Sequence, residues 1–180
     1  YHGRLEFSEE MSDAELKGRV STVLEQLDLS HVAKTVVGDE NVRGLSGGQR
    51  KRLNVAMELM SEPSFLILDE PTSGLDARSA MELIRQCREL ANAGRTVAMT
   101  IHQPRLEAFE LFDKVLLLTQ GGRVAYFGPP GGAEENGVRE YFVEHSSLPG
   151  SVAQNPADYA LDALDPVDQR LRKEPSFWDE

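Results

Sequence analysis

The sequence predicts an α/β fold with a mostly parallel sheet, because apolar strands alternate with amphipathic helices along the chain. Three short apolar runs without polar alternation, at 65–68, 97–101 and 115–118, are typical of strands covered on both faces. Apolar residues at helical spacing over 80–91 predict a helix that closes at Gly94 between the first two strands. This order predicts a right-handed parallel crossover, with helices flanking the sheet.

Two helices are predicted before the first strand. Residues 12–15, Ser-Asp-Ala-Glu, have the form of a capping box, and the apolar residues that follow fall on one helical face. A turn-rich stretch over 37–41 then leads to Gly47 and Gly48, after which apolar residues repeat at helical spacing until Pro63 stops the pattern. The two glycines are therefore expected at the start of a helix.

The last third of the chain is predicted to contain a hairpin and two helices. Segments 114–119 and 123–127 flank a glycine turn and are expected to pair as antiparallel strands. A helix is expected over 138–143, and Asn155 followed by Pro156 predicts the start of a last, short helix. Beyond it, the charged and proline-interrupted segment is expected to be a linker.

Composition narrows the class of protein. The 180 residues carry 19 basic and 30 acidic side chains, a formal charge of −11 that disfavours binding to nucleic acid. Cys87 is the single cysteine and can form no internal disulfide. The sequence has neither a signal peptide nor an apolar run long enough to span a bilayer, so we expect a cytosolic location that still allows a membrane partner.

Residues 45–49, Leu-Ser-Gly-Gly-Gln, predict an anion-binding helix terminus. Gly47 and Gly48 remove side chains where the helix begins, so backbone N–H groups and the Ser46 hydroxyl can donate to a phosphate. A plain serine-capped helix is the alternative for these residues taken alone. The basic run Arg-Lys-Arg over 50–52 is interpreted as solvated surface or as part of an interface.

Acidic residues follow the strand at 65–68, at the sheet edge where open α/β folds bind ligands. We assign Asp69 to Mg²⁺, held through its hydration water, and Glu70 to the base that polarises a water for attack on a γ-phosphate. The alternative is that these acids have no function and are acidic only because the chain reaches solvent where the strand ends. Asp76 ends a tight loop and is expected at an interface, a role compatible with capping the next helix.

His102 follows the strand predicted at 97–101, so a parallel sheet would bring it to the edge that carries Asp69 and Glu70. Its imidazole is a candidate contact for the γ-phosphate or the attacking water. The other histidines, His2, His31 and His145, have no such setting.

These motifs resemble the ATP-binding cassette of ABC transporters. Residues 45–49 are similar to its signature motif, 65–70 to its Walker B strand, 73–76 to its D-loop and His102 to its switch histidine. The resemblance narrows to the G subfamily, the white-brown and pleiotropic-drug-resistance type, through segments such as Ile-His-Gln-Pro at 101–104 and Asn-Pro-Ala-Asp at 155–158.

The resemblance implies the C-terminal part of a P-loop NTPase cassette. Residues 1–60 would be the helical subdomain, 61–165 the second half of the catalytic core with a G-subfamily extension, and 166–180 a linker or tail. No Gly-x-x-x-x-Gly-Lys-Ser/Thr phosphate loop occurs in the sequence, so we interpret the chain as a fragment that begins after that loop and is inactive by itself.

The resemblance also implies roles and partners. Two cassettes would form a head-to-tail dimer in which Ser46, Gly47, Gly48 and Gln49 act on the nucleotide of the other cassette, while Asp69, Glu70 and His102 act on their own. ATP and Mg²⁺ would be bound at the cytosolic face of a membrane, next to a transmembrane domain. Hydrolysis would drive the export of a lipid, a sterol or another hydrophobic small molecule.

Two other functions stay open at this point. One is an ATPase of DNA repair or chromosome maintenance, which predicts long heptad helices and a basic face. The other is a cassette that binds nucleotide without hydrolysis and serves as a clamp, which predicts a degenerate site.

Overall fold

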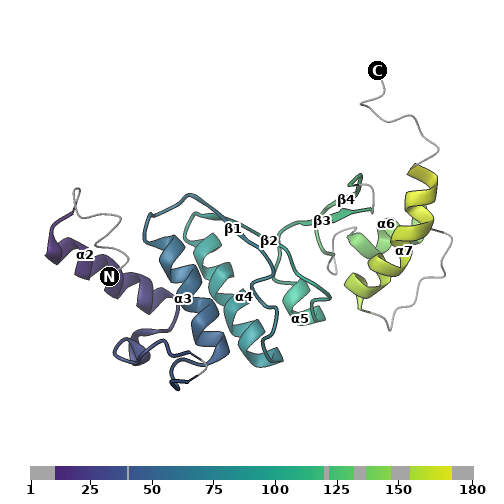
Figure 1. Cartoon of the computed structure of the whole chain (residues 1–180). Helices are drawn as coiled ribbons and strands as arrows, with labels where there is room; N and C mark the ends of the chain where they lie inside the picture. The colour runs from purple at the N-terminus through teal and green to yellow at the C-terminus, as the bar shows by residue number, and fades with distance from the viewer. Residues whose placement is uncertain (1–10, 40, 120–121, 132–136, 147–154, 172–180) are drawn as a thin grey trace. The chain divides into compact units, whose positions relative to one another are not determined.

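A computed structural model describes residues 11–39, 41–119, 122–131, 137–146 and 155–171 of the chain. The chain divides into two compact units, 1–102 and 103–180 (Figure 1). The described part of the first unit contains α2 (Asp13–Gln26), the 3-10 helix η1 (Ser30–Val32), α3 (Gly47–Leu59), β1 (Phe65–Leu68), α4 (Ala77–Asn92) and β2 (Thr96–Met99).

The strands of the first unit confirm the predicted parallel crossover. β1 and β2 pair in parallel, with Phe65 opposite Thr96 and Leu68 opposite Met99, and α4 lies between them in the sequence. Their carboxyl ends therefore meet at one edge of the sheet, where polar residues follow both strands. This register is what places the candidate site.

Local capping explains where the helices of the first unit begin. The Ser12 hydroxyl accepts from the Glu15 N–H and the Glu15 carboxylate accepts from the Ser12 N–H, so the predicted capping box of α2 is confirmed. α2, α3 and α4 lie in a row, with α3 in contact with both neighbours (Figure 1). Their facing side chains form a core with β1: Leu16, Val23, Leu27, Leu29, Val55, Ala56, Leu59, Met60, Leu66, Leu68, Leu83, Cys87 and Leu90.

The prediction that β1 is covered on both faces is wrong for the described structure. Leu66 and Leu68 are 4% and 8% exposed, but Phe65 and Ile67 are 53% and 70% exposed. Side chains of a strand alternate between the two faces of its sheet, and only the face that carries Leu66 and Leu68 packs on helices here.

The second unit contains a hairpin with three helices. Its described elements are α5 (Leu106–Phe109), β3 (Val115–Leu118), β4 (Val124–Gly128), α6 (Val138–His145) and α7 (Pro156–Leu171). β3 and β4 pair antiparallel, as predicted, although residues 120 and 121 of the predicted turn lie outside the described part. β3 also departs from the expectation of a strand covered on both faces, because Leu116 and Leu118 are exposed.

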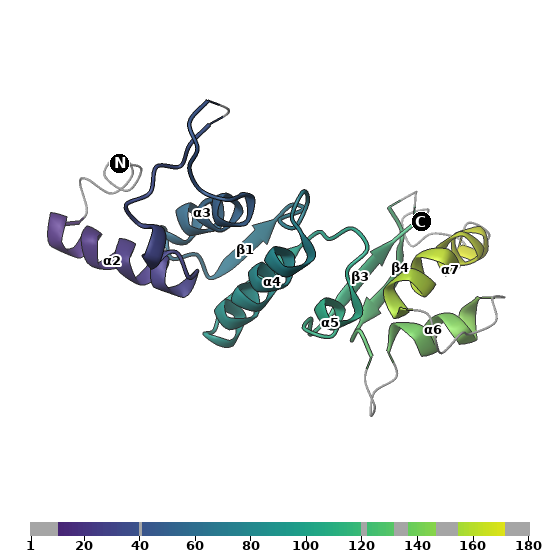
Figure 2. The ribbon, with the colours of Figure 1, turned by 90° about the horizontal axis from the view of Figure 1, so that it is seen from below.

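The helices α6 and α7 lie side by side in this unit (Figure 2). They bury a second core with α5 and β4: Phe109, Ala125, Tyr126, Val138, Phe142, Ala157, Tyr159, Ala160 and Ala163. The Asn155 side chain accepts from the Ala157 N–H, which confirms the predicted cap, and donates to the Pro104 carbonyl. α7 is longer than the short helix predicted and continues past residue 165 to Leu171, while residues 172–180 lie outside the described part.

Candidate functional site

The acidic pair follows β1 and is held by a residue that follows β2. The Thr100 N–H donates to the Leu68 carbonyl at 3.0 Å, which carries the strand pairing one step beyond β2. The Thr100 hydroxyl donates to Asp69 Oδ1 at 2.6 Å and accepts from the Glu70 N–H at 2.8 Å. The structure therefore brings Asp69, Glu70 and Thr100 together at one sheet edge, and sequence reasoning missed Thr100.

The backbone at Glu70 has an uncommon conformation. Its φ of 42° lies in the left-handed region, which is rare for residues other than glycine, and the following Pro71 restricts it further. The Ser73 N–H donates to the Glu70 carbonyl at 3.1 Å, so the chain turns immediately after the acid. Both carboxylates are exposed, as a site that receives a ligand from solvent requires.

His102 lies three residues after the end of β2 and is exposed. Thr100 lies two residues before His102 in the segment that follows β2, and it contacts both acids. His102 therefore follows its strand at the same sheet edge as Asp69 and Glu70. Within the described residues, no hydrogen bond or ion pair joins the imidazole to Asp69 or Glu70. The proposed role of His102 remains a prediction.

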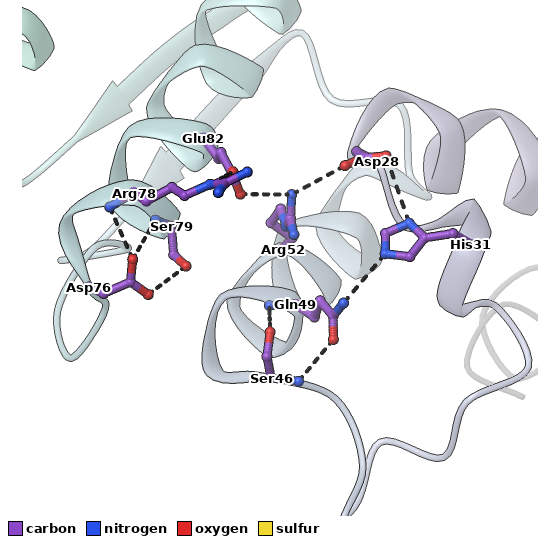
Figure 3. Close-up of polar contacts among 9 residues, drawn as sticks. All are labelled: Asp28, His31, Ser46, Gln49, Arg52, Asp76, Arg78, Ser79 and Glu82. Carbon is purple, nitrogen blue, oxygen red and sulfur yellow. Dashed lines mark hydrogen bonds and ion pairs between the residues drawn. The ribbon is translucent and has the colours of Figure 1, made fainter.

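The helix terminus at Ser46 is closed by a capping box. The Ser46 hydroxyl accepts from the Gln49 N–H at 3.2 Å, and the Gln49 side-chain carbonyl accepts from the Ser46 N–H at 2.9 Å (Figure 3). These two donors are therefore already used. The box leaves the N–H groups of Gly47 and Gly48 as first-turn donors without a partner within the helix, and of these two residues Gly47 is exposed whereas Gly48 is buried.

Gly48 fits closely against the start of α4. A β-carbon at Gly48 would lie 3.1 Å from both Cβ and Oγ of Ser79, whereas one at Gly47 would meet only Leu75 Cδ2, at 3.8 Å. The Ser79 hydroxyl in turn donates to Asp76, whose carboxylate also accepts from the N–H groups of Arg78 and Ser79 and caps α4 (Figure 3). These bonds, above all that from the Ser79 N–H, hold the pKa of Asp76 below its usual value.

Two further side chains lie near this helix terminus, and for one of them, Arg52, the surface interpretation from the sequence is wrong. His31 lies on η1 with its ring 3.5 Å from the Gln49 side-chain nitrogen and 3.8 Å from the Asp28 carboxylate (Figure 3). Arg52 is not solvated surface, because it is 8% exposed and its guanidinium lies 3.8 Å from both Asp28 and Glu82. A charge run does not reveal which of its members faces the neighbouring helices.

Replacing Arg52 with alanine is expected to lower the free energy of unfolding by about 1–2 kcal/mol. The change removes the packing of a buried aliphatic stem and the cation between two carboxylates on α4 and after α2. Chemical denaturation measures the loss. Arg85→Ala, on the exposed side of α4, is the matched control and is expected to change stability by less than about 0.5 kcal/mol. Equal effects of the two substitutions would contradict the structural role of Arg52.

The donor set of the acidic pair fits Mg²⁺ only together with ligands from a substrate. Among the residues that the structure describes, no three His, Cys, Asp or Glu side chains lie together as a protein-only metal site would need. Mg²⁺ is commonly held by one or two carboxylates plus phosphate oxygens and waters. Asp69 meets that requirement, because Thr100 occupies Oδ1 and leaves Oδ2 available.

Two protein families match the chain. One match lies in the first unit, and the other covers most of the second. Residues 3–73 match the ABC transporter family and residues 102–176 match the ABC-2 type transporter family. ABC transporter G family member 30 of Arabidopsis thaliana is 46% identical over 79% of this chain and 10% of that protein. Member 38 of Oryza sativa subsp. japonica is 45% identical over 88% of this chain and 10% of that protein.

The chain belongs to the ABC transporter G family. Member 21 of Arabidopsis thaliana is 41% identical over 90% of this G-family chain and 23% of its own length. The chain thus spans 10% of the length of the first curated relatives it matches.

Solved structures confirm the fold of this G-family chain. An ATP-binding cassette of an ABC transporter, MJ1267 in its ADP conformation, superposes with a TM-score of 0.56 at 25% identity, over 68% of this chain and 46% of that one. CbiO1 from Clostridium perfringens, part of the ABC transporter complex CbiONQ, gives 0.58 at 28% identity, over 72% and 49%. The chain therefore has the α/β fold of part of an ABC ATPase cassette. None of its described helices has the length and apolar character needed to cross a bilayer.

Proposed function

We propose that the chain is part of a nucleotide-binding cassette that binds and hydrolyses ATP between two protein faces. The observation that carries the proposal is the pair of exposed carboxylates fixed by Thr100 at the carboxyl edge of a parallel sheet. The capped helix terminus at Ser46 to Gln49 supports it with backbone donors for phosphate.

This geometry and the resemblance to ABC cassettes support the roles we propose. Glu70 accepts a proton from the attacking water, and His102 contacts the γ-phosphate or that water. Ser46, Gly47, Gly48 and Gln49 bind the nucleotide held by a second cassette, and Asp76 lies at the interface between the two. Asp69 would hold Mg²⁺ through water, and the ion would supply neutralisation of charge on the phosphates.

The organisation we propose has three parts: residues 1–60 as a helical subdomain, 61–165 as the second half of the catalytic core with its extension, and 166–180 as a linker whose first residues are the end of α7. The cassette forms a head-to-tail dimer on the cytosolic face of a membrane and is attached to a transmembrane domain. Closure on ATP and reopening after hydrolysis drive export of a lipid, sterol or hydrophobic small molecule. The membership in a transporter family supports this proposal.

The test is a chimera in which this chain replaces the matching segment of ABC transporter G family member 21. The rest of the cassette and the membrane domain come from the relative, which is 41% identical over this segment. We expect the purified chimera to release phosphate from ATP within about tenfold of the parental rate. A folded chimera that binds ATP and yet releases no phosphate above background would refute the hydrolytic role.

A further inference from the structure

We infer that Thr100 is a positioning residue for the acidic pair, a role that rests on the proposed function of Asp69 and Glu70. Thr100 touches both acids with one hydroxyl group, across a separation of 30 and 31 residues in the sequence. No other side chain among the described residues forms a hydrogen bond with either acid.

The polarity of the two hydrogen bonds is fixed by chemistry. A hydroxyl has one hydrogen, and the Asp69 carboxylate can only accept, so the Thr100 hydrogen goes to Asp69 Oδ1 at 2.6 Å. The Thr100 oxygen is then free to accept from the Glu70 N–H at 2.8 Å. The short distance to Asp69 is typical of a hydroxyl bonded to a carboxylate. Asp69 is thereby held in one orientation, with Oδ2 left for a ligand.

The second bond acts on the backbone of Glu70. This residue is neither glycine nor asparagine, has a φ of 42°, and precedes a proline, so its conformation is unfavourable without support. Such conformations persist where the surrounding structure holds them in place. The Thr100 oxygen supplies that support by accepting from the Glu70 N–H. The bond restrains the backbone of the residue that carries the carboxylate. One hydroxyl therefore sets the rotamer of Asp69 and the backbone of Glu70.

The substitutions that test this role are Thr100→Val and Thr100→Ser, made in the chimera described above. Valine keeps the branched shape of threonine and loses the hydroxyl, whereas serine keeps the hydroxyl and loses a methyl group. Thr96→Val is the matched control, because Thr96 begins β2 and lies at the opposite end of the same strand. Steady-state phosphate release at varied ATP and Mg²⁺ gives kcat and KM. Hydrogen exchange of the peptide that contains Glu70, measured without nucleotide, reports on the backbone bond itself.

We expect Thr100→Val to lower kcat about 10- to 100-fold, the usual effect of losing a group that orients a metal-binding or catalytic side chain. The KM for ATP should change by less than about threefold, because the phosphate donors lie elsewhere. Exchange at the Glu70 amide should accelerate by about fivefold. Thr100→Ser should restore kcat to within about threefold of the parent, and Thr96→Val should match the parent.

Any one of three results at Thr100 and Glu70 would by itself overturn the role of Thr100 in a chimera that hydrolyses ATP, and so would a fourth pattern that includes Thr96→Val. The three results are an unchanged kcat in Thr100→Val, an equal loss of kcat in Thr100→Ser, and an unchanged exchange rate at Glu70. A loss of kcat with a parallel fall in thermal stability and the same loss in Thr96→Val would identify a general effect on the strand and would also overturn it. An unmodified chimera without ATPase activity refutes the proposed function instead, which separates the two failures.

Discussion

Glu70→Gln is expected to lower the kcat for ATP hydrolysis about 10²- to 10⁴-fold while ATP binding stays intact. The amide has the size of the carboxylate but cannot accept a proton from water, and a general base contributes a factor of this order. The Glu70 N–H still donates to Thr100, so the left-handed turn is preserved. Phosphate release and equilibrium binding of ATP, both in the chimera with member 21, measure the two quantities.

The specificity of this effect is checked with Glu89→Gln. Glu89 is exposed on α4 and carries no proposed role, so the same chemical change there should leave kcat within about twofold of the parent. If Glu70→Gln retained parental turnover, another group would have to be the base. Equal affinities for ATP in the two variants would show that the loss lies in the chemical step.

Gly48→Asp is expected to lower kcat/KM for ATP hydrolysis about 100-fold or more without unfolding α3. A carboxylate in the first turn of a helix interacts favourably with its dipole, so the helix itself is not weakened. Its β-carbon starts 3.1 Å from Ser79, which has to shift, and the charge is added to a residue whose own N–H is proposed to bind phosphate. Two like charges about 4 Å apart repel by about 4 kcal/mol at an effective dielectric constant of about 20, which exceeds the effect needed.

The steric part of that change is separated by Gly48→Ala and Gly47→Ala. The alanine at 48 meets Ser79 at 3.1 Å and requires a small shift, whereas the alanine at 47 meets only Leu75, at ordinary contact distance. We expect Gly47→Ala within about twofold of the parental kcat/KM for ATP and Gly48→Ala within about tenfold. A Gly48→Asp variant as active as Gly48→Ala would remove the helix terminus from the nucleotide site. Circular dichroism confirms that each variant is folded.

Local signals in the sequence were sufficient for α2, α3, α4, α6, the start of α7, the hairpin and the parallel crossover, but not for η1 and α5, which were not predicted. The capping box at Ser12 and the glycines after Ser46 act within one turn of backbone, so their consequences are visible in a few consecutive residues. The same local signals located Asp69, Glu70 and Asp76 at the ends of elements. Their proposed roles still require the experiments above.

Features that depend on neighbours distant in the sequence could not be predicted. Thr100 reaches Asp69 only through the register of β1 on β2, and a threonine after a strand carries no signal of its own. Arg52 is one of three consecutive basic residues, and only the packing of α3 between α2 and α4 decides that it is buried. The exposure of Phe65 and Ile67 likewise depends on what covers the sheet, since an apolar run looks the same whether one or both faces are packed.

The close approach of Gly48 to Ser79 makes these two positions a compensating pair. Any evolutionary enlargement at one position needs room at the other, so a glycine at 79 would make an alanine at 48 tolerable, at the expense of one of the hydroxyl contacts that steady Asp76. Homologues in which both positions carry bulky side chains would have to hold these two helices further apart at their amino ends.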